Sequence, residues 1–161
     1  MNRISILLVS LVMAGTAFLT LANAASHGAN AEADDDDAPA LGMAGVLSSG
    51  NRGKIPQLTL SAGMPLLDGE GIIRLKSGVY YELEISADGS QELQLTAPGF
   101  FRAIWIDEVV IDGIEVRPLG LDSLEFDEAG TAEISFLAIK PGTYTLGVPG
   151  SDLQRVELII E

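Results

Sequence analysis

The sequence predicts an all-β fold, a β-sandwich, over about its last hundred residues. Apolar and polar side chains alternate with a period of two from about residue 55 onwards, as they do in half-buried strands. The alternating segments are short, recur at roughly ten-residue intervals and are separated by turns rich in Gly and Pro. No stretch after the N-terminal apolar run has the spacing of an amphipathic helix.

The alternation assigns faces as well as strands. Val79, Tyr81, Leu83 and Ile85 fall on one face of the first clear strand and predict the side that meets the core. Further alternating segments are expected as strands at residues 93–95, 114–117, 124–127, 132–138, 143–148 and 156–160. The dense apolar segment 100–106, which carries Trp105, is expected as one more. A buried or strand-face role is expected for Trp105, whereas an exposed tryptophan would mark a contact point for a partner.

The first 24 residues have the pattern of a signal peptide. A weakly positive start with Arg3 precedes an apolar run from residue 4 to 21, and the run ends in Ala22-Asn23-Ala24. The alternative is an uncleaved membrane anchor, because the run approaches the length that spans a bilayer. We expect cleavage after Ala24, a periplasmic or secreted location, and no stable membrane insertion after cleavage.

Residues 25–54 are expected to form an acidic, disordered tether ahead of the sandwich at 55–161. They contain four consecutive aspartates, 34–37, which repel one another and have no apolar partner. The more apolar segment 41–47 is a candidate for docking onto the domain. The formal charge of −14 disfavours nucleic acid as a partner and favours a metal cation or a protein with a basic surface.

Three segments resemble the cupredoxin family. They are residues 75–83 (LKSGVYYEL), the pair of segments 124–126 and 134–136, and residues 140–146 (KPGTYTL), which match the turn and strand that lead into the family's copper loop. The resemblance covers about half the chain and implies a single Greek-key β-sandwich of cupredoxin-like type.

The same resemblance implies that the copper ligands of the family are missing. A type 1 site needs a thiolate, and the chain contains no cysteine. Ser151 stands roughly where the loop histidine would be, and Phe100, Phe101 and Arg102 stand where the other histidine is expected. The resemblance therefore supports the architecture and withdraws electron transfer as the function.

Enzymatic chemistry is not expected. The only histidine, His27, lies in the tether, so nucleophilic systems that depend on a rigidly held imidazole are excluded. Carboxylate pairs occur at 107–108, at 112 and 115, and at 127–128, and two acids can hydrolyse glycosides. A solvated polar face is the simpler explanation of these acids.

One metal site is predicted outside the sandwich. Cleavage after Ala24 leaves a mature chain that begins with Ala25, Ser26 and His27. The free amine, two deprotonated backbone amides and the imidazole place four nitrogens in one plane, an arrangement that Cu(II) favours.

We therefore expect an exported, non-catalytic, cupredoxin-like accessory protein that binds Cu(II) through its mature N-terminus. The alternative is a metal-free interaction or structural subunit of an envelope complex. An enzyme that uses paired carboxylates is a third and more distant possibility, and a concave acidic cleft would support it.

Overall fold

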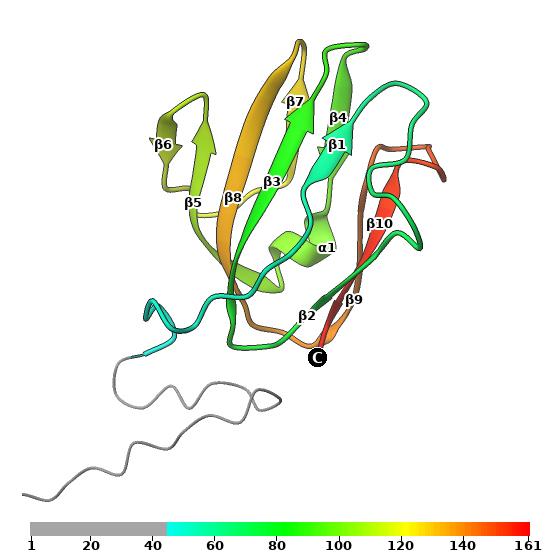
Figure 1. The fold of residues 1–161 in the computed structure, drawn as a ribbon. Coiled ribbons are helices and arrows are strands. Elements are labelled where there is room, and N and C mark those ends of the chain that lie inside the picture. Colours follow the sequence, from blue (N-terminus) through cyan, green and yellow to red (C-terminus); the bar gives the residue numbers. More distant parts are fainter. Residues whose placement is uncertain (1–44) are drawn as a thin grey trace, which may run out of the picture. The chain divides into compact units, whose positions relative to one another are not determined.

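The computed structural model of the chain describes residues 45–161 (Figure 1). They form ten strands and one short helix. In chain order these are β1 (Leu58–Leu60), β2 (Ile72–Leu75), β3 (Tyr80–Ala87), β4 (Leu93–Thr96), α1 (Pro98–Phe101), β5 (Ile104–Ile111), β6 (Ile114–Val116), β7 (Ser123–Phe126), β8 (Gly130–Ala138), β9 (Gly142–Gly147) and β10 (Arg155–Ile160).

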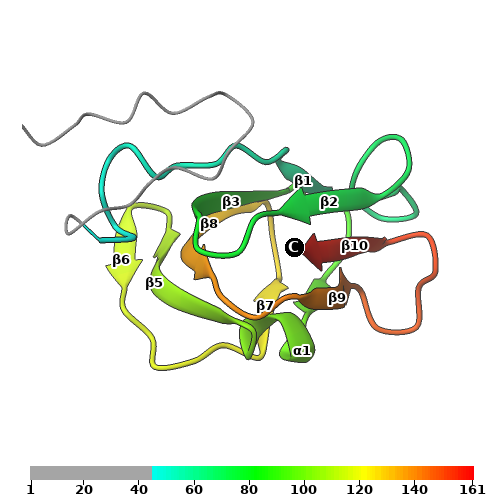
Figure 2. The same cartoon turned by 90° about the horizontal axis from the view of Figure 1, so that it is seen from below.

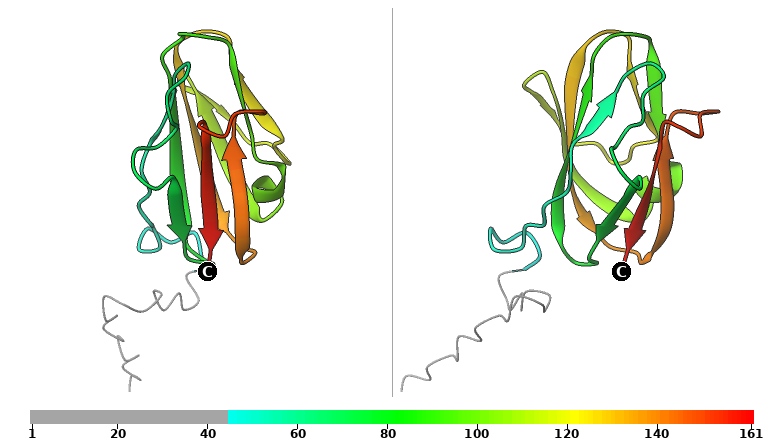
Figure 3. Two further views of the ribbon diagram at one scale, coloured as in Figure 1. Left: turned by 90° about the vertical axis from the view of Figure 1, so that its right-hand side faces the viewer. Right: turned by 45° about the vertical axis from the view of Figure 1, so that its right-hand side comes forward.

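The strands form two five-stranded sheets that face each other. Sheet A has the order β1-β3-β8-β5-β6, and sheet B has the order β2-β10-β9-β4-β7. Figures 2 and 3 show the sheets as two layers, and the chain crosses repeatedly from one to the other. Most neighbours within a sheet are not consecutive in the sequence, which is the mark of Greek-key connections. The predicted all-β sandwich is confirmed.

The period-two alternation places the core where the sequence predicts it. Tyr81, Leu83 and Ile85 of β3 are at most 5% exposed. They lie opposite residues of β8 that are buried against the same core, with Leu83 opposite Ile134. Phe136, fully buried, stacks on Tyr81 with ring centroids 5.8 Å apart. Burial of these apolar faces between the sheets supplies most of the stabilisation of the fold.

A bulge in β5 resolves a conflict in its sequence. Strict alternation from Ile106 would turn Glu108 into the core and Val109 towards solvent. The pairing of β5 with β8 instead shifts register between Ile106 and Glu108. The extra residue leaves Asp107 and Glu108 outside and returns Val109 to the core, where it is 3% exposed.

A two-residue turn joins β5 to β6. Asp112 and Gly113 have φ angles of 47° and 81°, and two consecutive positive φ values are characteristic of the type I′ hairpin turn. This turn fixes the register that pairs Ile111 with Ile114 and Val109 with Val116. All three residues of β6 are exposed at the end of sheet A.

The expectation of a strand over residues 100–106 is wrong in its first part. Pro98 stands in the first turn of α1, where its fixed φ favours a helix, and the helix carries Phe100 and Phe101 into the core. The strand β5 begins only at Ile104. A dense apolar run has no period, so it cannot by itself distinguish a buried strand from a buried helical turn.

The segment 75–83, one of the three that resemble the cupredoxins, is not a single strand. It contains the last residue of β2, a turn and the first residues of β3. Gly78 makes that turn with a φ of 83°, which side-chain-bearing residues rarely adopt.

Residues 45–54, assigned from the sequence to the tether, contact the sandwich. Asn51 is fully buried and donates its side-chain amide to the carbonyl oxygens of Val46 and Gly78, both at 2.7 Å. Arg52 forms a parallel bridge with Tyr80 at the start of β3, on the same edge of β3 that pairs with β1 further along the strand. Ordered contacts with the sandwich therefore begin before residue 55.

The predicted signal peptide, 1–24, and the tether as far as residue 44 lie outside the described residues. Within residues 45–161, no helix has the length and apolar character needed to cross a membrane.

Candidate functional site

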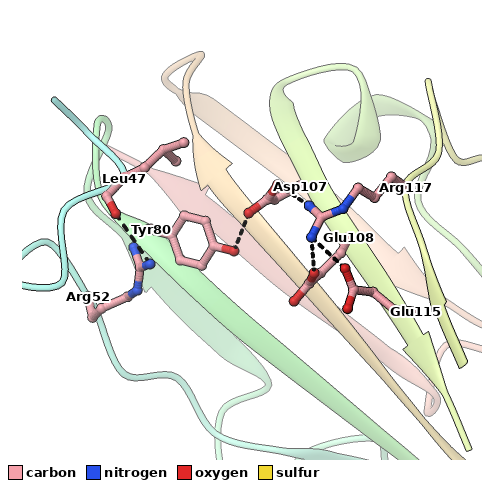
Figure 4. Close-up of polar contacts among 7 residues, drawn as sticks. All are labelled: Leu47, Arg52, Tyr80, Asp107, Glu108, Glu115 and Arg117. Carbon is pink, nitrogen blue, oxygen red and sulfur yellow. Dashed lines mark hydrogen bonds and ion pairs between the residues drawn. The ribbon is translucent and has the colours of Figure 1, made fainter. Parts of the chain in front are cut away.

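Three carboxylates surround one guanidinium on the outer face of sheet A. Arg117 donates to Asp107 at 2.9 Å, to Glu108 at 3.0 Å and to Glu115 (Figure 4). We call these four residues the Arg117 cluster. The bulge supplies the first two carboxylates from adjacent positions of β5, and the hairpin brings the third from β6. Three acids around one base leave an excess of negative charge.

A chain of contacts connects the Arg117 cluster to the N-terminal segment. The hydroxyl of Tyr80 donates to Asp107 at 2.9 Å, and the guanidinium of Arg52 lies 3.7 Å from the centre of the Tyr80 ring (Figure 4). That cation–π contact covers the ring and explains why an outward-facing tyrosine is only 4% exposed. Burial, together with the neighbouring Asp107 carboxylate, raises the pKa of Tyr80.

The electrostatics of the cluster follow from its composition. Partial removal from water, followed by the nearby Glu115 carboxylate, raises the pKa of Glu108. The carboxylates, Glu115 foremost, raise the pKa of Arg117. Every acid here is held by the same guanidinium on an open sheet face, so the cluster does not present the free acid and base of a glycoside hydrolase.

Of the carboxylate pairs predicted from the sequence, only the pair at 107–108 lies together in one cluster. Asp107 and Glu108 do lie together in the Arg117 cluster, whereas Asp112 lies in the β5–β6 turn. Asp127 groups with two acids from other segments, Glu92 and Glu125. Their ligand atoms all lie within 4.8 Å of one another, and all three residues are exposed.

Ser151, where the resemblance places the loop histidine, borders an open hollow, whereas residues 100–102, where the other histidine is expected, are not among its lining residues. The corner between β4 and α1 and the loop between β9 and β10 line an open space of about 660 Å³. Gly99, Ser151 and Asp152 are among its lining residues. Asp152 pairs with Arg155 at 3.4 Å, and the backbone N–H of Gln154 donates to the Ser151 hydroxyl at 3.2 Å. This donor set of hydroxyls and one paired carboxylate does not fit a type 1 copper ion.

Trp105 is the large exposed aromatic side chain of sheet A. It is 43% exposed, while its neighbours Ile104 and Ile106 are at most 9% exposed. It therefore points outwards from β5, on the face that carries Asp107. The strand-face position expected from the sequence is thus confirmed and burial in the core is not, so the indole is open to contact with a partner.

No family model and no curated protein matches the chain. Solved structures do match, each over 55% of this chain. They include a multicopper oxidase from Pseudomonas thermotolerans (17% identity, 22% of that chain, TM-score 0.44), a blue copper oxidase from Nitrosomonas europaea (15%, 30%, 0.43) and a copper nitrite reductase from the same organism (13%, 32%, 0.45). The two facing sheets of residues 45–161 agree with the cupredoxin-like architecture that the resemblance in the sequence implies. The match spans a third or less of those proteins' length.

The predicted metal ligands Ala25, Ser26 and His27 lie outside the described residues. Sequence reasoning missed the Arg117 cluster. One signal for it was available, because the Asp112-Gly113 pair is characteristic of a hairpin turn and places residues 108 and 117 close to each other.

Proposed function

We propose that the chain is an exported, non-catalytic accessory protein with a cupredoxin-like fold that binds Cu(II) through Ala25, Ser26 and His27. The observation that carries the proposal is the position of its one histidine, third after the expected cleavage site, ahead of a sandwich with no histidine or cysteine. Four nitrogens in one plane suit Cu(II), and the chelate rings need no folded scaffold.

The non-catalytic part of the proposal draws support from the Arg117 cluster. A general acid or base must be free to exchange a proton with a substrate held close to it. Asp107 and Glu108 are both engaged by Arg117 on the surface of sheet A instead.

The alternative is a metal-free interaction or structural subunit of an envelope complex. The exposed Trp105 beside an acidic sheet face favours it, since exposed aromatic side chains are common anchors of protein interfaces. In either case the expected location is periplasmic or secreted, and the expected protein partner carries a basic surface.

The test begins with the mature protein purified from the compartment to which it is exported. Mass spectrometry should give an N-terminus at Ala25, and titration with Cu(II) should produce a d–d absorption band in the green region at one equivalent. His27→Ala should abolish the band, and Ser26→Pro should abolish it by removing a backbone N–H that becomes a ligand. Ser26→Ala is the matched control and should keep the band.

An unchanged band in His27→Ala, or a mature chain that begins elsewhere, contradicts the copper proposal. Metal analysis of protein taken from its native compartment then separates the two functions. Copper at about one equivalent supports the first, and its absence supports the metal-free subunit.

A further inference from the structure

An apolar row crosses the outer face of sheet A at Trp105. Trp105 lies directly opposite Leu137 on β8, and Leu137 lies opposite Tyr80 on β3. Leu137 and Tyr80 are only 8% and 4% exposed, so the row is covered except at Trp105. Ile139, one pleat beyond Leu137, adds a side chain that is 50% exposed. The exposed apolar surface on this face therefore comes from the indole of Trp105 and from Ile139.

A small hollow adjoins that indole on the side away from β8. The strand β6 pairs only with residues 109–111 of β5, so the first half of β5 has no partner strand there. Among the described residues, no backbone hydrogen bond joins residues 104–107 to the segment 117–122 that passes beside them. The hollow between these segments has a volume of about 140 Å³ and is lined by Phe101, Ile104–Ile106 and Pro118–Gly120. Every lining side chain is apolar, and Leu119 at its rim is fully exposed (111%).

The acidic groups near this hollow favour a positively charged occupant. Asp107 lies on the same face as Trp105, and the Arg117 cluster to which it belongs has three acids for one base. Further along the same face, Glu84 lies directly opposite Glu133, and like charges in that position repel each other. A second copy of this acidic chain would add to that repulsion, whereas Lys or Arg side chains would relieve it.

We propose that this surface binds an extended basic segment of a partner protein, with an apolar side chain in the hollow between Trp105 and Leu119 and flanking cations over the Arg117 cluster. Three observations support this proposal: the exposed side chains of Trp105 and Ile139, the hollow, and the excess of acidic groups beside them. It deepens the expectation of a partner with a basic surface and rests on that expectation, but it does not depend on copper at residues 25–27.

The chain contains a single tryptophan, so Trp105 itself reports on binding. The probe is a capped pentapeptide that alternates three lysines with two leucines, and its matched control replaces the lysines by glutamates. Titration of the mature protein should shift the Trp105 emission to shorter wavelength, as expected when an indole leaves water. The glutamate peptide should leave the emission unchanged, and the affinity for the lysine peptide should fall as salt is raised.

Paired variants test the location. Leu119→Ser and Glu133→Gln should each weaken binding of the lysine peptide, the first by about fivefold or more as for an interface anchor. Their controls are Leu153→Ser, at a leucine that is 54% exposed in the β9–β10 loop, and Glu157→Gln on sheet B; both should bind within about twofold of the parent. All four side chains are at least partly exposed, and far-ultraviolet spectra check that each variant is folded.

The inference is overturned by the absence of an emission shift, by equal binding of the glutamate peptide, or by an equal loss of binding in the Leu119 and Leu153 variants. A shift in Trp105 emission that appears without peptide when the protein concentration is raised also overturns the inference. It would identify a second copy of the chain as the occupant. If binding fails while the His27-dependent copper band persists, the docking surface is wrong and the copper proposal stands.

Discussion

The substitution Gly53→Ala tests how the N-terminal end of the described chain is held against the sandwich. The backbone N–H of Gly53 donates to the carbonyl oxygen of Tyr80 at 2.8 Å, which sets the segment close to the Tyr81 ring. A Cβ added at Gly53 would lie 2.7 Å from both Cδ1 and Cζ of that ring. Real Cβ atoms almost never approach within 3.0 Å of a neighbour, so the ring or the segment must move.

The ring has little freedom to move. Tyr81 is 5% exposed, its hydroxyl accepts a hydrogen bond from the backbone N–H of Lys76 at 2.8 Å, and its face stacks on Phe136. Inserting one methyl group into such packing costs about 1–3 kcal/mol, a large share of the roughly 5–15 kcal/mol that stabilises a domain. The midpoint of urea unfolding should therefore fall by on the order of 1 M.

Gly50→Ala is the matched control. It makes the same chemical change three residues away, where an added Cβ would meet no atom within 4 Å. Its free energy of unfolding should stay within about 0.5 kcal/mol of the parent. Equal unfolding midpoints for the two variants would refute the packing of residues 45–54 on the sandwich. Proteolysis between residues 45 and 53 should also be faster in Gly53→Ala than in Gly50→Ala.

Two further predictions concern titration. Burial raises the pKa of Tyr80 and of Tyr81 above 10.0, so their stabilising effect is complete below about pH 10 and is lost as pH rises through the raised values. The urea midpoint should fall across that range, less steeply in Tyr81→Phe, and equal slopes in parent and variant would contradict this. Arg117→Gln removes the positive charge that lowers the pKa of Glu108, so NMR titration of that carboxyl should give a higher pKa than in the parent. An unchanged value would place the guanidinium elsewhere.

The sandwich was predictable because most of its strands carry their own period-two signal. The inward faces of β3 and β8 follow from alternation alone, which is a local property of the sequence. The bulge in β5 was partly visible, since two consecutive acids interrupt the alternation between Ile106 and Val109. Alternation alone does not tell whether β5 forms a bulge there, with Val109 returned to the core, or continues in regular register with Glu108 facing inwards. That depends on the pairing of β5 with β8.

The contacts of residues 45–54 could not be found in this way. The segment has little apolar periodicity, and its attachment depends on a polar side chain, Asn51, which donates to the carbonyl oxygen of Val46 within the segment and to that of Gly78, 27 residues away in the sequence. Burial of an amide is favourable only when such partners are present, and sequence alone does not place them. The composition of the segment therefore suggested a tether where the structure has an anchored edge.

The loop between β9 and β10 shows how a cupredoxin-like sandwich can keep its shape without the family's ligands. In a cupredoxin this loop would carry copper ligands, and the bound metal ion would hold the loop in place. Here the N–H of Val148 donates to Gln154 O (2.9 Å) and joins the ends of the loop, and the N–H of Ser151 donates to Val148 O (3.1 Å) and closes a turn within it.

The Gln154 side chain, 6% exposed, then donates to the carbonyl oxygen of Ser61 at 2.8 Å and ties the loop to the chain that follows β1. Amide and hydroxyl groups of the protein thus supply contacts that fix the loop. We therefore expect the sandwich to fold without a metal ion in this loop. We therefore expect that binding of Cu(II) at residues 25–27 leaves the midpoint of urea unfolding of the sandwich unchanged.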